Sequence, residues 1–306
     1  MINWKLTTFG ESHGVAVGGV MEGCPSGLKI DRKFIAGELA RRATGKTSSE
    51  SQRRESDEVE FLSGLLDDVT LGTPIAFMVR NTDARPEDYE ALKDQFRPSH
   101  ADFTYQAKYG IRDWRGGGRA SARTMLPYVV AGAIAKQILS QHDIRVSASV
   151  LSIGGETDPS KIESLLKQCR AEGDSVGGMV HGSITGLPVG LGEPLDDKFQ
   201  ACLAKAMFTI PAVKGFEYGD GFAMASMKGS EANDPMVLDD NGSVLFLSNH
   251  SGGVQGGITN GEEVFFNVAF KPIPTISRGD RHDVCALPRA LVIVEAMAAL
   301  TTMQFL

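Results

Sequence analysis

The chain has 306 residues, of which 42% are hydrophobic and 23% are charged, and its formal net charge at pH 7 is −7. This length and composition are those of an ordinary globular protein with a large core, built as one big domain or two. The acidic balance argues against general nucleic-acid binding as the main task. No apolar run approaches the roughly 18–20 residues that a membrane helix needs.

The N-terminal residues and the cysteines indicate the same cellular compartment. Residues 1–5 lack the basic-then-apolar layout of a signal peptide. The four cysteines are widely separated and form no C-x-x-C pair, which disfavours a zinc ribbon or a thioredoxin-like site and is typical of reduced thiols: Cys24, Cys169, Cys202 and Cys285. We expect a cytoplasmic protein.

The predicted elements mix helices and strands. The strongest helix signal covers residues 121–139, which are apolar over much of the helix surface, and Pro127 inside it predicts a kink or a helix that starts near Pro127. Asp31 is the expected N-cap of an earlier helix. The other predicted helices are 34–42, 162–170, 197–207 and 288–303. The predicted strands are 59–65, 73–79, 244–248 and 264–270.

An internal echo connects the two halves of the chain. The run Pro25-Ser-Gly-Leu28 precedes Asp31-Arg-Lys-Phe34 and a predicted helix. The run Pro188-Val-Gly-Leu191 precedes Asp196-Asp-Lys-Phe199 and another predicted helix, with two more residues between the parts. Two related strand–turn–helix units predict a pseudo-symmetric fold, and chance similarity of turn chemistry is the alternative. No low-complexity linker divides the chain, so we favour a single α+β domain over residues 1–306.

The first polar motif runs from Thr8 to Gly14, Thr-Phe-Gly-Glu-Ser-His-Gly. Flanking glycines place His13 in a tight turn, where its imidazole could donate a proton to a leaving group. In isolation, a histidine that only caps a turn is the commoner outcome.

The second motif is basic. Between Arg97 and Arg123 six basic residues face two acids, a local charge of +4. His100 lies between an arginine and Asp102, which push its pKa in opposite directions. The glycines at 116–118 lead into the predicted helix at Ser121, where free N–H groups would form an anion seat. Arg119 and Arg123 would share a face of its first turn. A basic pocket in an acidic protein suits a small anionic ligand.

Two further motifs lie in the second half. The glycine-rich loop 248–257 permits close approach of a flat ring or a phosphate, although a wide hairpin turn is equally compatible with it. Arg281-His282-Asp283 supplies a carboxylate that could act as a general base, with a salt-bridged surface turn as the alternative. The histidines lack the H-x-x-x-H spacing of a metal site, so no metal is expected.

Taken together, these motifs resemble the chorismate synthase family. Their order and context match from about Thr7 to Leu300, and Ala212-Val-Lys-Gly215 matches as well. The resemblance implies that 5-enolpyruvylshikimate 3-phosphate loses phosphate and a C6 proton in a trans-1,4 elimination to give chorismate. It also implies a requirement for reduced FMN without net redox change, within the shikimate pathway of aromatic amino acid biosynthesis.

The resemblance also implies residue roles. His13 would protonate the departing phosphate, His100 would assist the protonation state of the flavin, and Asp283 would tune the flavin N5 environment. The implied substrate contacts are Ser12, Arg42, Ser48, Arg97, Ser121, Arg123 and Arg281. The implied flavin contacts are Arg119, Ala120, Ser121, Pro211, Ala212, Gly256, Lys271, Pro272, Ile273, Pro274, Thr275 and Arg281.

The chain departs from the family pattern at several places. Ser48 replaces a usual basic residue, for which Lys46 could compensate, and Pro211 replaces a frequent asparagine. The segments 154–162 and 276–279 are shorter than is usual in the family. They indicate either a compact variant or a sequence from which loops are missing, and we favour missing loops at 276–279.

The family fold is a β-α-β sandwich, with helices between antiparallel sheets and pseudo-symmetric halves, assembled as a homotetramer. NADPH as reductant and an external flavin reductase are further implied partners. Two rival functions remain at this point. One is an FMN-dependent NAD(P)H oxidoreductase, which would consume NAD(P)H in a net redox reaction. The other is an RNA-binding module that uses the Arg-Gly-Gly-Gly-Arg loop, which the acidic balance disfavours.

Overall fold

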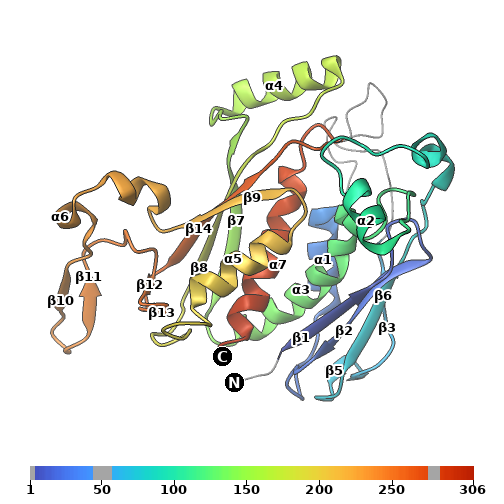
Figure 1. Ribbon diagram of the computed structural model, residues 1–306. Coiled ribbons are helices and arrows are strands. Elements are labelled where there is room, and N and C mark those ends of the chain that lie inside the picture. The colour runs from blue at the N-terminus through green and yellow to red at the C-terminus, as the bar shows by residue number, and fades with distance from the viewer. Residues whose placement is uncertain (1–3, 44–56, 275–282) are drawn as a thin grey trace.

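Two antiparallel four-stranded sheets frame the molecule (Figure 1). The computed structural model describes residues 4–43, 57–274 and 283–306. The first sheet has the order β1 (Lys5–Phe9), β2 (Ala16–Glu22), β6 (Ile75–Arg80), β3 (Val59–Phe61). The second has the order β7 (Arg145–Ile153), β8 (Gly178–Thr185), β14 (Val264–Phe270), β9 (Val213–Tyr218). Strand β14 shows the half-buried alternation that a packed antiparallel sheet requires.

Shorter elements lie between the main strands and helices along the chain. The two-stranded ribbons are β4 (Leu65–Leu66) with β5 (Val69–Thr70), β10 (Met236–Leu238) with β11 (Val244–Phe246), and β12 (Val254–Gln255) with β13 (Ile258–Thr259). The 3-10 helices are η1 (Pro86–Leu92), η2 (Gly118–Ala120), η3 (Ala122–Met125) and η4 (Gly221–Ser226). The short or peripheral helices are α2 (Asp102–Tyr109), α4 (Pro159–Glu172) and α6 (Gly229–Ala232).

Four helices carry the core: α1 (Arg32–Arg42), α3 (Leu126–Ser140), α5 (Phe199–Thr209) and α7 (Leu287–Met303). Helix α3 packs on β2 and on α7, and α7 packs in turn on β7 and β8 (Figure 1). Gly132 of α3 allows a close approach, because a Cβ there would lie 2.4 Å from the Cβ of Ala296. Leu126 and Val294 are fully buried, so the helix pair forms the hydrophobic centre between the sheets.

A buried ionic network fixes the helices relative to one another. Glu295 of α7 accepts from Arg41 Nη2 at 2.6 Å and from Lys136 Nζ at 2.5 Å, and its Oε1 accepts from the Ala148 backbone N–H at 3.1 Å. Glu38 of α1 also contacts both cations. Buried carboxylates require such pairing. The network therefore fixes the C-terminal end of α1, where Arg42 enters the site described below.

The two turns of the internal echo make matching hydrogen bonds. Thr70 Oγ1 donates to Pro25 O at 2.6 Å and accepts from the Leu28 N–H at 2.9 Å. Thr259 Oγ1 donates to Pro188 O at 2.7 Å and accepts from the Leu191 N–H at 2.9 Å. The backbone bonds of the two threonines to the two turns also correspond. The two halves thus use the same set of threonine hydrogen bonds to join a turn to a strand.

Replacing either threonine with valine should therefore destabilise the fold. Thr70 and Thr259 are 2% and 1% exposed. Thr70→Val and Thr259→Val each leave a buried N–H without its acceptor and a partly buried carbonyl without its donor. We expect each to lower the free energy of unfolding by about 1–3 kcal/mol in urea titrations. Thr209→Val, on an exposed helix face, is the matched control and should change it by less than about 0.5 kcal/mol. Equal effects at all three sites would contradict a specific role of the paired turns.

Most predicted helices and strands occur, and several differ from the prediction in where they begin or end. Asp31 caps α1 by accepting from the Lys33 and Phe34 N–H groups at 2.8 and 3.0 Å. The strand expected over 59–65 breaks after Phe61, because Gly64 turns the chain at φ 82°. Five strands of the two main sheets were not predicted: β1, β2, β7, β8 and β9.

The predicted helix 121–139 begins late. Helix α3 starts at Leu126 with Pro127 in its first turn. Of the two alternatives, a kink at Pro127 or a helix that starts near it, the second is therefore confirmed. Ser121 is extended at ψ 143°, and the residues before α3 form two 3-10 turns. The α-helix start predicted at Ser121 is therefore wrong, because the glycines lead into two 3-10 turns that precede α3.

The connection at 154–162 is a complete tight turn. Ile153 and Glu156 exchange two backbone hydrogen bonds of 3.0 and 2.9 Å, and Asp158 caps α4. The segment 276–279 lies outside the described residues.

In the described part of the chain, no helix combines the length and the apolar character that crossing a bilayer requires.

Candidate active site

Two histidines from distant parts of the chain flank one glycine loop. Gly116 and Gly117 adopt φ of 59° and 87°. A Cβ on Gly116 would lie 2.1 Å from His13 Cε1, and a Cβ on Gly117 would lie 2.9 Å from His100 Cε1. No side chain fits at either position, so these glycines are required by close approach as well as by positive φ. The structure thus brings the two predicted acid–base groups together.

The loop that carries His13 is held by its neighbours. The Ser12 N–H donates to Gly118 O at 3.3 Å. The Asn81 side-chain amide donates to Glu11 O at 3.0 Å and to Gly14 O at 2.7 Å. The His13 ring meets the Tyr89 ring edge-on, with centroids 4.9 Å apart, and is only 8% exposed. A buried imidazole in a fixed orientation suits positioned proton transfer.

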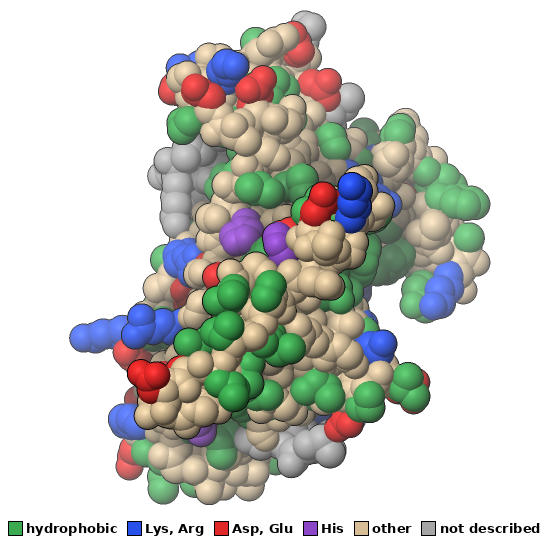
Figure 2. Space-filling view, turned by 90° about the vertical axis from the view of Figure 1, so that its left-hand side faces the viewer, with side chains coloured by type: hydrophobic (Ala, Val, Ile, Leu, Met, Phe, Trp, Pro, Cys, Tyr) green, Lys and Arg blue, Asp and Glu red, His purple; other side chains and the backbone are tan. Residues whose placement is uncertain are grey.

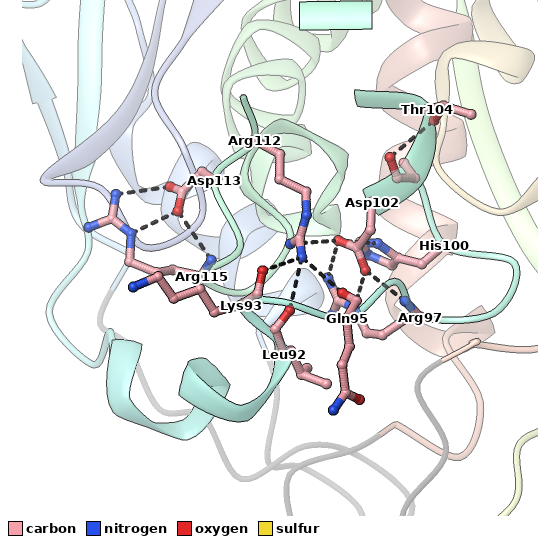
Figure 3. Close-up of polar contacts among 11 residues, drawn as sticks. Leu92, Lys93, Gln95, Arg97, His100, Asp102, Thr104, Arg112, Asp113 and Arg115 are labelled. Atoms are coloured by element: carbon pink, nitrogen blue, oxygen red, sulfur yellow. Dashed lines mark hydrogen bonds and ion pairs between the residues drawn. The ribbon is translucent and has the colours of Figure 1, made fainter. Parts of the chain in front are cut away.

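His100 belongs to a second network, drawn in Figure 3. Its Nδ1 lies 3.1 Å from Asp102 Oδ1. Arg97 forms a bidentate pair with Asp102, through Nε at 2.8 Å and Nη2 at 3.0 Å, and Arg112 contacts the same carboxylate at 3.4 Å. Arg112 Nη2 also donates to the carbonyls of Leu92, Lys93 and Gln95. The network therefore fixes the end of η1, the helix that carries Tyr89.

The charges around His100 favour its neutral form. Burial lowers the pKa of His100, and Arg97 and Lys271 add to that effect, while Asp102 opposes it. Burial alone would raise the pKa of Asp102, but its hydrogen bonds from Arg97 outweigh burial and hold that pKa at about 2. His100 is therefore an uncharged imidazole beside a permanent carboxylate at neutral pH.

Arg42 and Arg123 meet at one carboxylate. Each donates to Asp57 at 2.9 Å, and all three side chains are buried. Arg123 also contacts Asn81 Oδ1 and Arg80 O. Burial lowers the pKa of Arg42, and the opposite charge of Asp57, which raises that pKa, does not fully offset the effect of burial. These two predicted substrate residues thus lie together, but a bound anion would share them with Asp57.

Arg119 and Arg123 do not share a helix face, contrary to the sequence-based prediction. Arg119 Nη1 donates to Gly10 O at 2.9 Å and its Nη2 to Thr8 Oγ1 at 2.7 Å, whereas Arg123 is directed to Asp57. The residues lie in separate 3-10 turns divided by extended Ser121. Ser121 Oγ accepts from the Arg123 N–H at 3.4 Å.

A cavity of about 320 Å³ borders this region. His100, Gly117, Gly118, Arg119 and Ala120 are among the residues that line it. The side-chain-free loop thus shares a cavity with an imidazole and with two arginines, Arg112 and Arg119, and it leaves room for a flat ligand. Three carboxylates also line the cavity: Glu11, Asp102 and Asp113.

Other predicted flavin residues approach from the second half of the chain. Lys271 Nζ donates to Ser99 O at 2.7 Å, next to His100, and the Lys271 N–H donates to Ala212 O at 2.9 Å. Ala212 has φ 72°, a strained value for a residue with a Cβ. The neighbours Pro211, Pro272, Ile273 and Pro274 continue these two segments, and Ile273 O accepts from Ser175 Oγ at 2.7 Å.

The remaining predicted residues are placed differently. Asp283 contacts Arg289 Nη2, and Arg289 is close enough to Arg42 to lower the pKa of its guanidinium. Gly256 lines another cavity of about 690 Å³, beside Phe216 and Phe222. The linings of the two cavities share no residue, so one copy of the chain does not bring Gly256 to the glycine loop. Ser48, Thr275, Arg281 and His282 lie outside the described residues, as does Lys46.

Sequence reasoning missed three residues that organise the site. Asp57 pairs both buried arginines, Asn81 joins the His13 loop to Arg123, and Tyr89 packs against His13. Asp57 and Asn81 lie at strand ends in unremarkable polar runs, and Tyr89 lies in a charged segment. Buried arginines need a carboxylate partner, so the expectation of two arginines in one site could have prompted a search for an acid such as Asp57.

The described residues contain no group of three or more His, Cys, Asp or Glu side chains that could hold a metal ion. What remains is a set of buried histidines, arginines and carboxylates around a glycine loop. Fold and site define an α+β enzyme that performs acid–base chemistry on a small anionic substrate.

The chain belongs to the chorismate synthase family, whose model matches residues 4–306. A chorismate synthase from Porphyromonas gingivalis is 49% identical, over 97% of this chain and 92% of that protein. One from Cytophaga hutchinsonii is 46% identical, over 99% of this chain and 95% of that protein. A crystal structure of chorismate synthase has a TM-score of 0.81 at 30% identity, covering 99% of this chain and 91% of that one.

The first alignment also bears on chain length. It spans 339 positions, although this chain has 306 residues. The relative therefore carries segments that this chain lacks, in agreement with the short connections expected from the sequence.

Proposed function

We propose that this chain is a lyase that eliminates phosphate from 5-enolpyruvylshikimate 3-phosphate to give chorismate. The observation that carries the proposal is the pair of histidines on consecutive glycines, Gly116 and Gly117, with arginines on either side. The substrate carries a phosphate and two carboxylates, for which arginines are the suited partners. Family membership supplies the reaction, and the site supplies groups of the kind that it needs.

His13 is the proposed acid. Its ring is held between the glycine loop and Tyr89, so that a phosphate above Gly116 would lie within reach of one ring nitrogen. Proton donation to the departing phosphate oxygen avoids release of a more highly charged anion. Ser12, on the same loop, would contact the same group.

Reduced FMN is the proposed cofactor, and the residues present fit it. The loop at Gly117 has no side chain to keep a planar ring away, Arg119 and Ala120 border the same cavity, and Lys271 lies beside His100. When bound, reduced flavin supplies electron density to the breaking C–O bond and recovers it. Neutral His100 would hold or release a proton on the flavin side, and Asp283 would set the charge near its N5.

Arg42, Arg97 and Arg123 are the proposed substrate arginines. Arg42 and Arg123 share the single carboxylate of Asp57, and Arg97 and Arg112 share that of Asp102, so each cluster keeps an excess of positive charge. A substrate anion would therefore add to existing ion pairs, which keep the guanidinium planes oriented before binding. The predicted contacts Ser48 and Arg281 remain proposals.

Replacing Arg123 with lysine should weaken substrate binding by about 1–3 kcal/mol, the scale of a charged hydrogen bond. Lysine keeps the charge, but it cannot reproduce the fork that contacts Asp57, Asn81 and Arg80 O together. Equilibrium titration with substrate measures the change. Arg80→Lys is the matched control, because Arg80 forms an exposed pair with Glu60. Unchanged affinity in Arg123→Lys would remove Arg123 from the substrate site.

Assembly as a homotetramer is part of the proposal. The β10–β11 ribbon projects from the body on the left of Figure 1, and its Met236 and Leu238 side chains are 60% and 70% exposed. Figure 2 shows the face on this side, over which hydrophobic side chains are widely spread. Contact with other copies would cover such a surface.

The finer features of the family complete the proposal. They are a single domain over residues 1–306, a β-α-β sandwich with pseudo-symmetric halves, a cytoplasmic location, and flavin reduction by NADPH or by an external reductase. The helices packed against both sheets and the matched threonine turns support the fold assignment.

An anaerobic assay tests the function. The purified chain is mixed with 5-enolpyruvylshikimate 3-phosphate, with and without chemically reduced FMN, and phosphate and chorismate are measured. We expect equal amounts of both products, only with reduced FMN, and no net oxidation of the flavin. Steady consumption of NADPH matched to substrate reduction would instead indicate an oxidoreductase, and absence of phosphate release would overturn the proposal.

A further inference from the structure

One edge of the His100 ring faces a carboxylate and the other faces the cavity. Nδ1 is buried and lies 3.1 Å from Asp102 Oδ1. The opposite edge, with Cε1 and Nε2, lies against Gly117, where a Cβ would be 2.9 and 3.0 Å from these atoms. His100 and Gly117 both line the 320 Å³ cavity.

Asp102 cannot turn away from this contact. Arg97 holds it through the backbone N–H at 3.1 Å and through Nε and Nη2 at 2.8 and 3.0 Å, and Arg112 approaches from a third side (Figure 3). Asp102 is 3% exposed. The four hydrogen bonds from Arg97 and Arg112 hold the carboxylate in one orientation, and in that orientation Oδ1 lies 3.1 Å from His100 Nδ1.

We propose that Asp102 is a positioning residue that fixes the tautomer of His100, so that Nδ1–H donates to Asp102 and Nε2 presents a lone pair to the cavity. The tautomer of an imidazole is set by the hydrogen bond of its other nitrogen. This extends the role of His100 in the proposed function and rests on it. It specifies that His100 meets its ligand as a hydrogen-bond acceptor.

The charges that face His100 act together with this geometry. Arg97 precedes it on the same loop, Lys271 approaches from the end of β14, and Asp102 begins α2. The two cations disfavour the imidazolium and the carboxylate favours it. Removing the carboxylate would leave the cations unopposed, so His100 should then be harder to protonate.

The chain contains a matched control for Asp102. Asp113 binds Arg115 with almost the same geometry, through the backbone N–H at 3.1 Å, Nε at 2.7 Å and Nη2 at 3.0 Å. Both pairs appear in Figure 3. Among the described residues, Asp113 forms no hydrogen bond or ion pair with a histidine, so it separates the loss of an arginine–aspartate pair from the loss of a histidine partner.

The first experiment uses the unaltered protein without flavin or substrate. Imidazole nitrogens are labelled with ¹⁵N, and the His100 signals are assigned by their absence in His100→Gln. We expect a protonated Nδ1 and an unprotonated Nε2 at neutral pH. The opposite tautomer, or an equal mixture, would overturn the proposal without any need for a variant at position 102.

The second experiment compares Asp102→Asn with Asp113→Asn. In Asp102→Asn we expect the fraction of Nδ1–H tautomer to fall and the midpoint of His100 titration to move about 1 pH unit or more lower. In Asp113→Asn both readouts should stay as in the unaltered protein. Equal changes in the two variants, or none in Asp102→Asn, would show that Asp102 only holds the loop. Asp102→Glu, which restores the charge, should recover part of the tautomer preference.

These readouts separate this inference from the proposed function. The tautomer is measured without cofactor or turnover, whereas the function is tested by phosphate release. A correct tautomer with no phosphate release would reject the function alone, and phosphate release with the wrong tautomer would reject the role of Asp102 alone.

Discussion

Replacing His13 with alanine should slow turnover by about 10²–10⁴-fold, the usual effect of losing a general acid, while flavin binding stays almost unchanged. His13 lies against Gly116 and Tyr89, whereas Gly117, Arg119 and Ala120 border the cavity proposed for the flavin. Single-turnover phosphate release with saturating substrate and reduced FMN measures the first effect, and flavin titration measures the second.

The control must separate chemistry from folding, because His13 is buried and its removal leaves a gap beside Tyr89. His142→Ala, in the exposed turn after α3, controls for removal of an imidazole as such. The folded fraction of each variant is measured beside its turnover. Near-normal turnover per folded molecule in His13→Ala would reduce His13 to a residue that only supports a turn.

Local sequence signals predicted the helices well. Asp31 as an N-cap and Pro127 as a residue of the first helical turn each have one local physical cause, and both appear in the structure. Strands β7 and β8 were missed because their pairing is set by partners far along the chain. Ser147 in β7, for instance, lies opposite Ser183 in β8, and neither residue has a strong strand preference of its own.

In the candidate site, too, features with a local cause were predicted and features that depend on distant partners were not. His13 and His100 were found because glycines and charges mark them in the sequence. That they lie on neighbouring glycines depends on contacts between loops that no local pattern contains. The pairing of Arg42 and Arg123 through Asp57 is likewise tertiary. The expectation that Arg119 and Arg123 share a helix face failed because the chain stays in 3-10 turns until Pro127 can begin a helix.

The repeated turns were the exception, since there a long-range feature could be read from the sequence. Pro-x-Gly-Leu occurs twice, and in each half a threonine about 40–70 residues away completes it. The threonines themselves were not identified, because nothing in their neighbourhood distinguishes them before the turn is in place.

Replacing Asp283 with asparagine should leave both ligands bound but remove most activity, by about 10²-fold or more. Asparagine keeps the shape of the side chain and removes the charge that is proposed to tune proton acceptance near the flavin. Asp283 also contacts Arg289, which lies near Arg42, so the charge belongs to the wider cluster around the substrate arginines. Stopped-flow absorbance under anaerobic conditions follows the chemical step, and separate titrations follow flavin and substrate.

Arg289→Gln gives the comparison that decides between chemistry and support. It breaks the same ion pair from the other side and keeps the carboxylate of Asp283. If Asp283 acts on the reaction, Arg289→Gln retains clearly more activity than Asp283→Asn at equal folded fraction. If the pair only fixes the start of α7, the two variants lose activity and stability in parallel, and the catalytic role of Asp283 falls.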